Sequence, residues 1–225
     1  MFGADMSAKE NREQILKLIT RDVPRDFLVK VMETLPSAYG QAFGAVTGIR
    51  PALHTSEVRR LLPQQRHYSQ NAAFRDCAAE LGLSAALQAT TPKGEHYPIV
   101  MTGEVMMGRI GVETSSRLPR LAKHRAMLAC LNARFEAVNG DLFNPLVPGE
   151  KEGMGAIVVT VNPPHHHTSQ DAPLGVFMGI PFTNFKGWHY YAPFEDVISA
   201  YHEEVVQEQP DLAWATLKKT LKNSE

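Results

Sequence analysis

The sequence has 225 residues, of which 44% are hydrophobic and 21% are charged, a composition typical of globular proteins. Lysine and arginine number 23 against 24 aspartate and glutamate residues, which gives a formal net charge of -1. These values argue against a globally disordered chain, and they require any nucleic-acid-binding surface to be a local patch. We expect one domain over residues 1–225, in which residues 1–82 are a candidate helical subdomain and residues 83–225 form a core that contains the sheet.

The lack of a recognisable targeting signal and the use of cysteine both predict a cytoplasmic location. Residues 1–14 lack the basic start and the apolar core of a secretory signal, and no stretch reaches the roughly 18 apolar residues of a membrane span. We therefore expect no membrane partner. Cys77 and Cys130 lie in alanine-rich, helix-like sequence, so we expect both thiols to be buried, without a disulfide or a nucleophilic role.

The first eighty residues have the spacing of helices. Apolar residues recur three and four positions apart in four segments, residues 9–20, 25–35, 38–48 and 56–81. Pro36 is expected to end the second helix, and Pro63 to interrupt or kink the fourth. These helices predict a layer that docks on the rest of the chain.

The remainder of the chain alternates strand and helix patterns. Residues 99–114 are rich in β-branched residues and glycine and predict two strands, most simply a hairpin. Residues 117–140 return to helical spacing. Residues 156–161 and 174–180 are nearly continuous apolar runs and predict strands buried on both faces. Helices are expected again near residues 194–206 and 211–221.

This order of elements predicts the fold class. We expect an α+β, or mixed α/β, protein in which a helical N-terminal layer packs on a mixed sheet of about four or five strands with flanking helices. The pattern does not determine whether the later strands run parallel or antiparallel to the hairpin, because the connection between them permits both.

Two basic segments lead to our first functional hypothesis. Arg59, Arg60 and Arg66 lie in the fourth predicted helix, and Arg120, Lys123 and Arg125 lie in the helix predicted over residues 117–140. Arginine near a helix start is at the unfavourable end of the helix dipole, so a polyanionic partner would explain it. We therefore expect a nucleic-acid-associated protein that binds DNA or RNA. The alternative interpretation is a solvated face whose cations pair with acidic residues elsewhere.

An aromatic segment could add to such a surface. Residues 181–194 are dense in aromatic side chains around Lys186 and Gly187, and Trp188 is the candidate to stack on a nucleic-acid base. The alternative is that these rings pack the end of a strand against the last helices.

A histidine cluster supports a second hypothesis, a metal-dependent hydrolytic enzyme. His165 and His167 would point the same way from an extended chain and could hold a divalent metal ion with a third ligand, for which His189 is the first candidate and His96 and Asp171 are alternatives. Glu104 or Glu113 would then serve as general base. The order of elements invites comparison with metal-dependent nucleases, but the usual acidic-x-lysine pair is missing from the hairpin. The histidines could equally lie in a solvated loop.

A third hypothesis is a protein-interaction or immunity-type module without catalysis, which would bind a protein partner or form a homodimer. Several familiar motifs are absent from the sequence: GxGxxG, the Walker GxxxxGK, GxSxG, CxxC and HExxH. Common nucleotide-binding and hydrolase folds are therefore disfavoured, and the three hypotheses remain open at the level of sequence.

Overall fold

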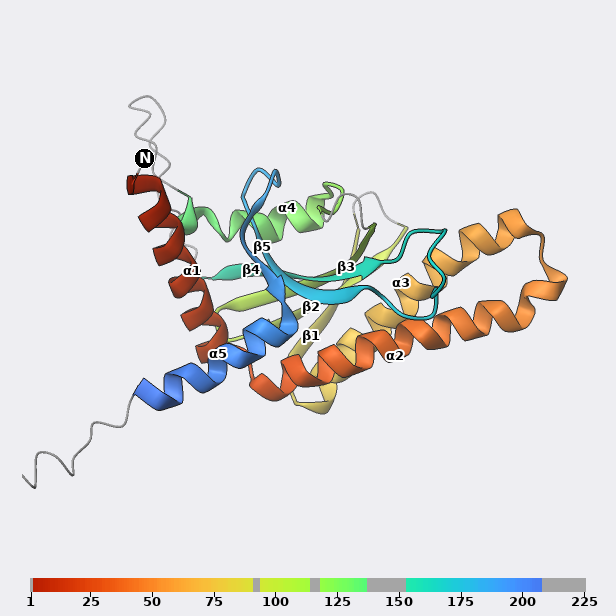
Figure 1. Ribbon diagram of the computed structural model, residues 1–225, viewed down its shortest axis with the longest axis horizontal. Helices are drawn as coiled ribbons and strands as arrows, with labels where there is room; N and C mark the ends of the chain where they lie inside the picture. Colours follow the sequence, from red (N-terminus) through yellow and green to blue (C-terminus); the bar gives the residue numbers. More distant parts are fainter. Residues whose placement is uncertain (1, 91–93, 114–117, 137–152, 208–225) are drawn as a thin grey trace, which may run out of the picture.

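A single six-stranded mixed sheet organises the computed structural model of the chain (Figure 1). The structure describes residues 2–90, 94–113, 118–136 and 153–207, with side chains from residue 9 to residue 201. The strands are β1 (Ser84–Ala89), β2 (His96–Thr102), β3 (Val105–Glu113), β4 (Met154–Asn162), β5 (Gly175–Pro181) and β6 (Trp188–Pro193). The helices are α1 (Phe2–Asp22), α2 (Arg25–Ile49), α3 (Thr55–Glu80), α4 (Lys123–Cys130) and α5 (Phe194–Gln207), with short 3-10 turns at Arg50–Ala52 and Ala133–Phe135.

The strands lie in the sheet in the same order as in the sequence. Strands β1, β2 and β3 pair antiparallel, as do β4, β5 and β6. The two halves join through β3 and β4, which are parallel over their whole length, from Val105 opposite Met154 to Glu113 opposite Asn162. Both central strands therefore end at the same edge of the sheet, where ligands of such sheets commonly bind.

Helices cover the sheet unequally. Buried apolar residues of α1, α2, α3 and α5 form one large cluster with inward-facing residues of the strands. Helix α4 packs on the opposite face, with Val112, Ile157 and Val159 beneath its Ala129. In Figure 1, α2 and α3 form a long hairpin that extends past the end of the sheet. In the described part of the chain, the sheet thus lies between α1, α2, α3 and α5 on one face and α4 on the other.

Helix α4 is seated on β4 by a close backbone approach. A side chain at Gly155 would overlap the backbone carbonyl group of Leu128, so only a residue without Cβ fits there. Next to this contact, the buried amide of Asn132 donates to the carbonyls of Gly155 and Pro181, both at 2.9 Å, and accepts from the Gly155 N–H at 2.9 Å. These bonds fix the chain after α4 to β4 and β5.

The predicted fold class is confirmed, with more strands than expected. The predicted hairpin is β2 and β3, with Gly103 at φ +51° in the turn, and the two apolar runs are β4 and β5. The additional strands are the two edge strands. Strand β1 has the alanine-rich sequence of a helix, and β6 is part of the aromatic segment at residues 181–194, for which we had predicted no strand. Both segments are strands because they pair with neighbours, β1 with β2 and β6 with β5. Strand formation depends on context more than on propensity.

Three predictions about the helices need correction. Helix α2 continues through Pro36 to Ile49, because Leu35, Tyr39 and Val46 are buried on both sides of the proline and offset its cost of about 3 kcal/mol. Helix α3 likewise continues through Pro63. The helix predicted over residues 117–140 is much shorter, Lys123–Cys130, so Arg120 precedes it. The helix expected near 211–221 lies outside the described residues.

Cys77 is buried, as predicted, whereas Cys130 is exposed at the last residue of α4. Only one face of α4 contacts the sheet, which leaves Cys130 on the other. None of the helices in the described part of the chain has the length and apolar character needed to span a membrane.

Candidate functional site

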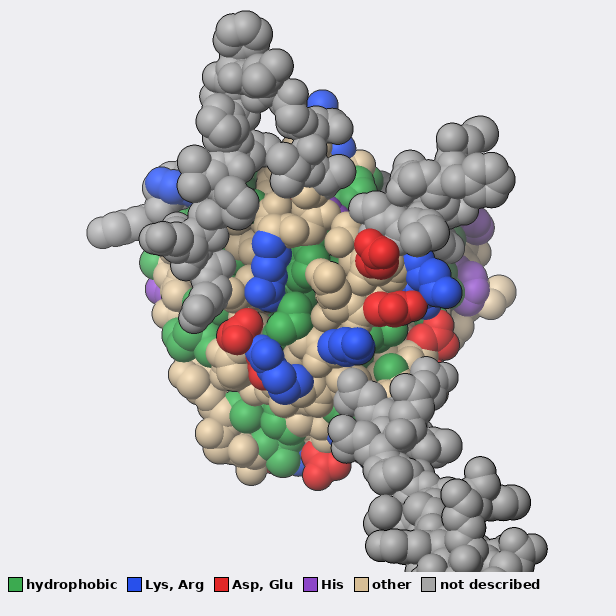
Figure 2. Space-filling model, turned by 90° about the vertical axis from the view of Figure 1, so that its left-hand side faces the viewer, with side chains coloured by type: hydrophobic (Ala, Val, Ile, Leu, Met, Phe, Trp, Pro, Cys, Tyr) green, Lys and Arg blue, Asp and Glu red, His purple; other side chains and the backbone are tan. Residues whose placement is uncertain are grey.

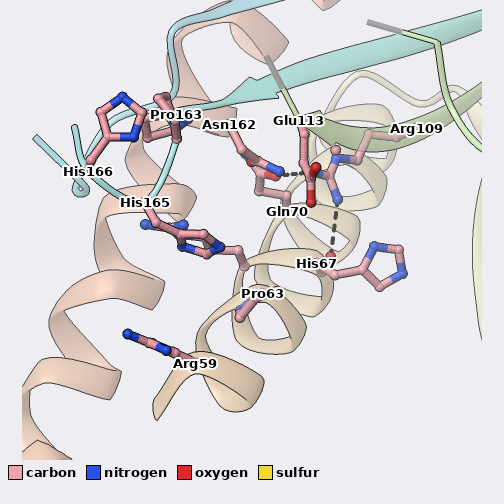
Figure 3. A pocket seen from close by; sticks show the side chains of 13 residues that line it. Arg59, Pro63, His67, Gln70, Arg109, Glu113, Asn162, Pro163, His165 and His166 are labelled. Atoms are coloured by element: carbon pink, nitrogen blue, oxygen red, sulfur yellow. Dashed lines mark hydrogen bonds between the residues drawn. The ribbon is translucent and has the colours of Figure 1, made fainter. Parts of the chain in front are cut away.

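A pocket of about 700 Å³ lies at the carboxyl ends of β3 and β4 (Figure 3). Helix α3 forms one wall, and the loop that follows β4 forms the opposite wall. Its lining contains three arginines, one carboxylate, several histidines and prolines, and two amides: Arg59, Pro63, Arg66, His67, Gln70, Arg109, Gly111, Glu113, Asn162, Pro163, Pro164, His165 and His166. The volume is in the range of small-ligand sites.

Helix α3 presents a regular row of side chains to this pocket. Arg59, Pro63, Arg66 and Gln70 are separated by four, three and four residues, which places them on one face of the helix. Arg59 is exposed at the rim, whereas Arg66 and Gln70 are buried deeper along the row. The polar face of α3 therefore lines the pocket at the edge of the sheet, with Arg59 at its exposed rim.

Arg109 is a buried cation in the middle of the apolar strand β3. Its side chain is 7% exposed, and its guanidinium donates to the His67 carbonyl and to the Asn71 amide oxygen, both at 3.2 Å, and to the Gln70 amide oxygen. Burial lowers the pKa of Arg109 to about 9, so the group remains charged at neutral pH. All of these acceptors are neutral, and none cancels its charge.

Arg66 lines the same pocket as Arg109 and is also buried. Its guanidinium carbon is 4.1 Å from the centre of the Tyr39 ring, and its Nη2 donates to the carbonyl of Gln170 in the β4–β5 loop. Burial lowers its pKa. The Nε atoms of Arg66 and Arg109 have no acceptor among the described residues. Two buried guanidinium groups that have no carboxylate partner in the described part of the chain are costly without a counterion and favour an anion.

A second, smaller hollow adjoins the pocket on the other side of β3. Its lining includes Arg120 and Arg125, and it shares Gly111 and Glu113 with the first pocket. Arg125 donates to the Arg120 carbonyl through Nε at 2.9 Å and Nη2 at 2.6 Å, again a neutral acceptor. The pKa of His67 is lowered by burial and by Arg109, with a smaller contribution from Arg125, so α4 and α3 influence each other electrostatically.

No protein-family model, curated protein sequence or solved structure matches this chain. Its function must therefore be argued from this site alone.

The structure brings together residues from the two basic segments that we predicted to bind nucleic acid. Arg59 and Arg66 line the pocket, and Arg120 and Arg125 line the adjoining hollow. Arg60 and Lys123 are exposed next to Arg59 and Arg125 along the chain. Residues about sixty positions apart thus converge around the carboxyl end of β3.

Trp188 does not belong to this group. It lies on β6 opposite Pro181 of β5, at the level of the amino end of β4, whereas the pocket lies at the carboxyl end. Its ring covers Gly179 and contacts Tyr191, with the ring centres 5.1 Å apart. This arrangement agrees with the alternative that the aromatic segment packs the core.

Replacing Trp188 by alanine is accordingly expected to lower the free energy of unfolding by about 2 kcal/mol, since a half-buried ring is lost from its contacts. Urea denaturation measures this change. The affinity for oligonucleotides should stay within twofold of the wild type. A large loss of affinity with an unchanged Tm would instead assign Trp188 to the binding surface.

The three predicted metal ligands do not converge. His165 lies in the pocket lining, and His167 is exposed with its Nδ1 bonded to the Ser169 backbone. His189 is buried between Phe135 and Phe182 at the far end of the sheet, 3.6 Å from a Glu136 oxygen. Among the described residues, no group of three or more histidine, cysteine or acidic side chains is arranged to hold a metal ion.

The two alternative candidates for the general base lie in different parts of the structure. Glu104 stands in the turn before β3 and Glu113 is the last residue of that strand, which places them about 25 to 30 Å apart at the usual rise per residue. Glu104 is paired with Arg21 at 2.9 Å and with Arg134 at 3.8 Å. Glu113 lines the pocket and is the carboxylate that an anionic ligand would meet.

Sequence reasoning found Arg66 but missed Arg109, the other arginine of the pocket floor, and the side chains that hold it. Arg109 interrupts an apolar strand, and a lone cation in such a strand is a signal for a buried functional group. The seven-residue spacing of Arg59 and Arg66 indicated a shared helix face. The partners Gln70 and Asn71 carried no signal of their own, because their role depends on the packing of α3 against β3.

Proposed function

We propose that this chain is a nucleic-acid-associated protein that binds DNA or RNA at the carboxyl ends of β3 and β4. The observation that supports this most is the meeting of the two basic segments on either side of β3. Arg59 and Arg66 approach from α3, and Arg120 and Arg125 from the chain before and within α4. Such a surface can contact several phosphates of one strand.

The pocket surface has an excess of basic side chains, whereas the face seen from the α1 side has a mixture of basic and acidic ones. The pocket lining has three arginines and one glutamate, so it carries a net positive charge with neutral histidines. Viewed from the α1 side, acidic and basic side chains are interspersed (Figure 2). Away from the pocket, Glu104 pairs with both Arg21 and Arg134. A polyanion would therefore be steered to the pocket end of the molecule.

The first turn of α4 gives further support. Lys123, His124 and Arg125 occupy it, although cations at a helix start are unfavourable and this turn has no acidic residue. Arg125 is fixed by the Arg120 carbonyl, and His124 stacks on Tyr97 with the ring centres 4.1 Å apart. The negative charge of a phosphate backbone that passes over this turn would offset the unfavourable interaction between these cations and the helix dipole.

Charge reversal of Arg59 and Arg120 tests the proposal. Both side chains are exposed on opposite sides of the β3 end, so the double variant R59E/R120E should fold normally. We expect it to bind a labelled single-stranded oligonucleotide about 100-fold more weakly, as two phosphate contacts become repulsive. Fluorescence anisotropy at low salt measures the affinity.

The matched control is K17E/R25E, which makes the same change in net charge on exposed residues of α1 and α2. Its affinity should remain close to that of the wild type. Equal losses in both variants would mean that net charge alone drives the interaction. Absence of binding by the wild type at low salt would refute the proposed function.

A further inference from the structure

The floor of the pocket contains more positive charge than the protein itself neutralises. Arg66 and Arg109 are 8% and 7% exposed, and their hydrogen bonds go to backbone carbonyls and side-chain amides. Glu113 is exposed at the mouth and makes no ion pair with either arginine among the described residues. A buried guanidinium that lacks a counterion loses its hydration without an equivalent return.

Tyr39 does not supply the missing negative charge. Its ring lies under the Arg66 guanidinium, and its hydroxyl has no hydrogen-bond partner among the described residues. Burial raises the pKa of Tyr39 to about 12, so the phenol stays neutral at physiological pH. Among the described residues, the two arginines are therefore pocket donors that have no acceptor of opposite charge.

The number of positive charges in the pocket indicates which class of anion it would bind. Two buried guanidinium groups that line one pocket match a dianion in charge, and a phosphate monoester carries about −1.5 to −2 charges at pH 7, whereas an internal phosphodiester carries one. The pocket is larger than a phosphate group alone, and Pro63, Pro163 and Pro164 give it apolar wall beside the cations. A nucleoside attached to the phosphate could occupy this part.

We propose that the pocket binds a phosphate monoester, with Arg66 and Arg109 as its ligands, and that its natural source is the phosphorylated end of a nucleic-acid strand. This inference rests on the proposed function for the identity of the ligand. Internal phosphates of the strand would lie along Arg59, Arg120 and Arg125, while the terminal phosphate enters the pocket. The protein would then discriminate strand ends from continuous strands.

Two measurements on the folded chain test the inference. Inorganic phosphate should raise the Tm of the wild type by several degrees relative to chloride at equal ionic strength, since a ligand stabilises the state that binds it. A 5′- or 3′-phosphorylated oligonucleotide should bind about tenfold more tightly than the same strand with hydroxyl ends, which is the difference expected from an additional charge-assisted contact.

Arg66→Met keeps much of the side-chain volume over Tyr39 and removes the charge, so it should abolish both effects. Arg75→Met, on α3 outside the pocket lining, is the matched control and should retain both. The wild-type measurements stand without either variant, should Arg66→Met fail to fold.

The possible outcomes separate the two proposals. If oligonucleotides bind equally well with and without a terminal phosphate, and inorganic phosphate gives no protection, the pocket inference is overturned while the proposed function stands. If phosphate protects the wild type but not Arg66→Met and no oligonucleotide binds, the pocket is confirmed as a phosphate-monoester site, its ligand is a small phosphate ester, and the proposed function fails.

Discussion

Replacing Gly155 by alanine is expected to lower the free energy of unfolding by about 3 kcal/mol, at the upper end of the usual cost of overpacking. The added methyl group would occupy the position of the Leu128 backbone carbonyl, and a backbone cannot move aside as the end of a flexible side chain can. Relief requires α4 to lift from β4. That movement would strain the three hydrogen bonds of the Asn132 amide.

Gly44→Ala provides the matched comparison, because the same methyl group is added at an exposed position of α2 with no atom within 4 Å. There the free energy of unfolding should rise by up to about 1 kcal/mol, since alanine is the better helix former. Urea denaturation of both variants measures the two changes. A Gly155→Ala protein as stable as the wild type would show that α4 is not seated on β4 in this way.

The affinity for a single-stranded oligonucleotide is expected to fall about 50-fold between 50 and 200 mM salt, for a surface that makes about four phosphate contacts. Each contact releases counterions from the strand, and added salt opposes that release. For a strand with a phosphorylated end, the four contacts correspond to Arg59, Arg120 and Arg125 along the strand and to Arg66 at the terminal phosphate.

In R59E/R120E, where two contacts remain, the decrease over the same range should be about sevenfold. Anisotropy titrations at a series of salt concentrations give both slopes. A wild-type affinity that does not depend on salt would contradict binding through phosphates. An unchanged slope in the double variant would place the contacts elsewhere on the molecule.

Much of the fold was predictable because its signals are local. The apolar runs at residues 156–161 and 174–180 became β4 and β5, since only a strand with both faces covered is apolar throughout. The edge strands were not predicted, because β1 has a helix-like sequence and β6 is a strand through its pairing with β5. Pro36 was misleading, because burial on both sides of it outweighs its local cost.

The site was predictable in its cation clusters but not in its geometry. Arg59, Arg66 and Arg120 were found because cations cluster along the sequence, and the packing of α3 against β3 then brought the two clusters together around the end of that strand. That packing was open at the level of sequence, and so was the position of Arg109. The strands also set the separations: β3 lies between Glu104, in the turn before it, and Glu113 at its end, and the pairing of β6 with β5 places His189 far from His165.

The proposed function depends most on which surface of the protein an oligonucleotide would contact. Ultraviolet cross-linking of the wild type to a single-stranded oligonucleotide that contains 5-iodouracil, with the attached peptides identified by mass spectrometry, examines this directly. We predict cross-links to the peptides around His67 and Tyr68 on α3 and around His165 and His166 in the pocket wall. Cross-links confined to Trp188 and Tyr191 on β6, or none under conditions where the oligonucleotide binds, would contradict the assignment of the site.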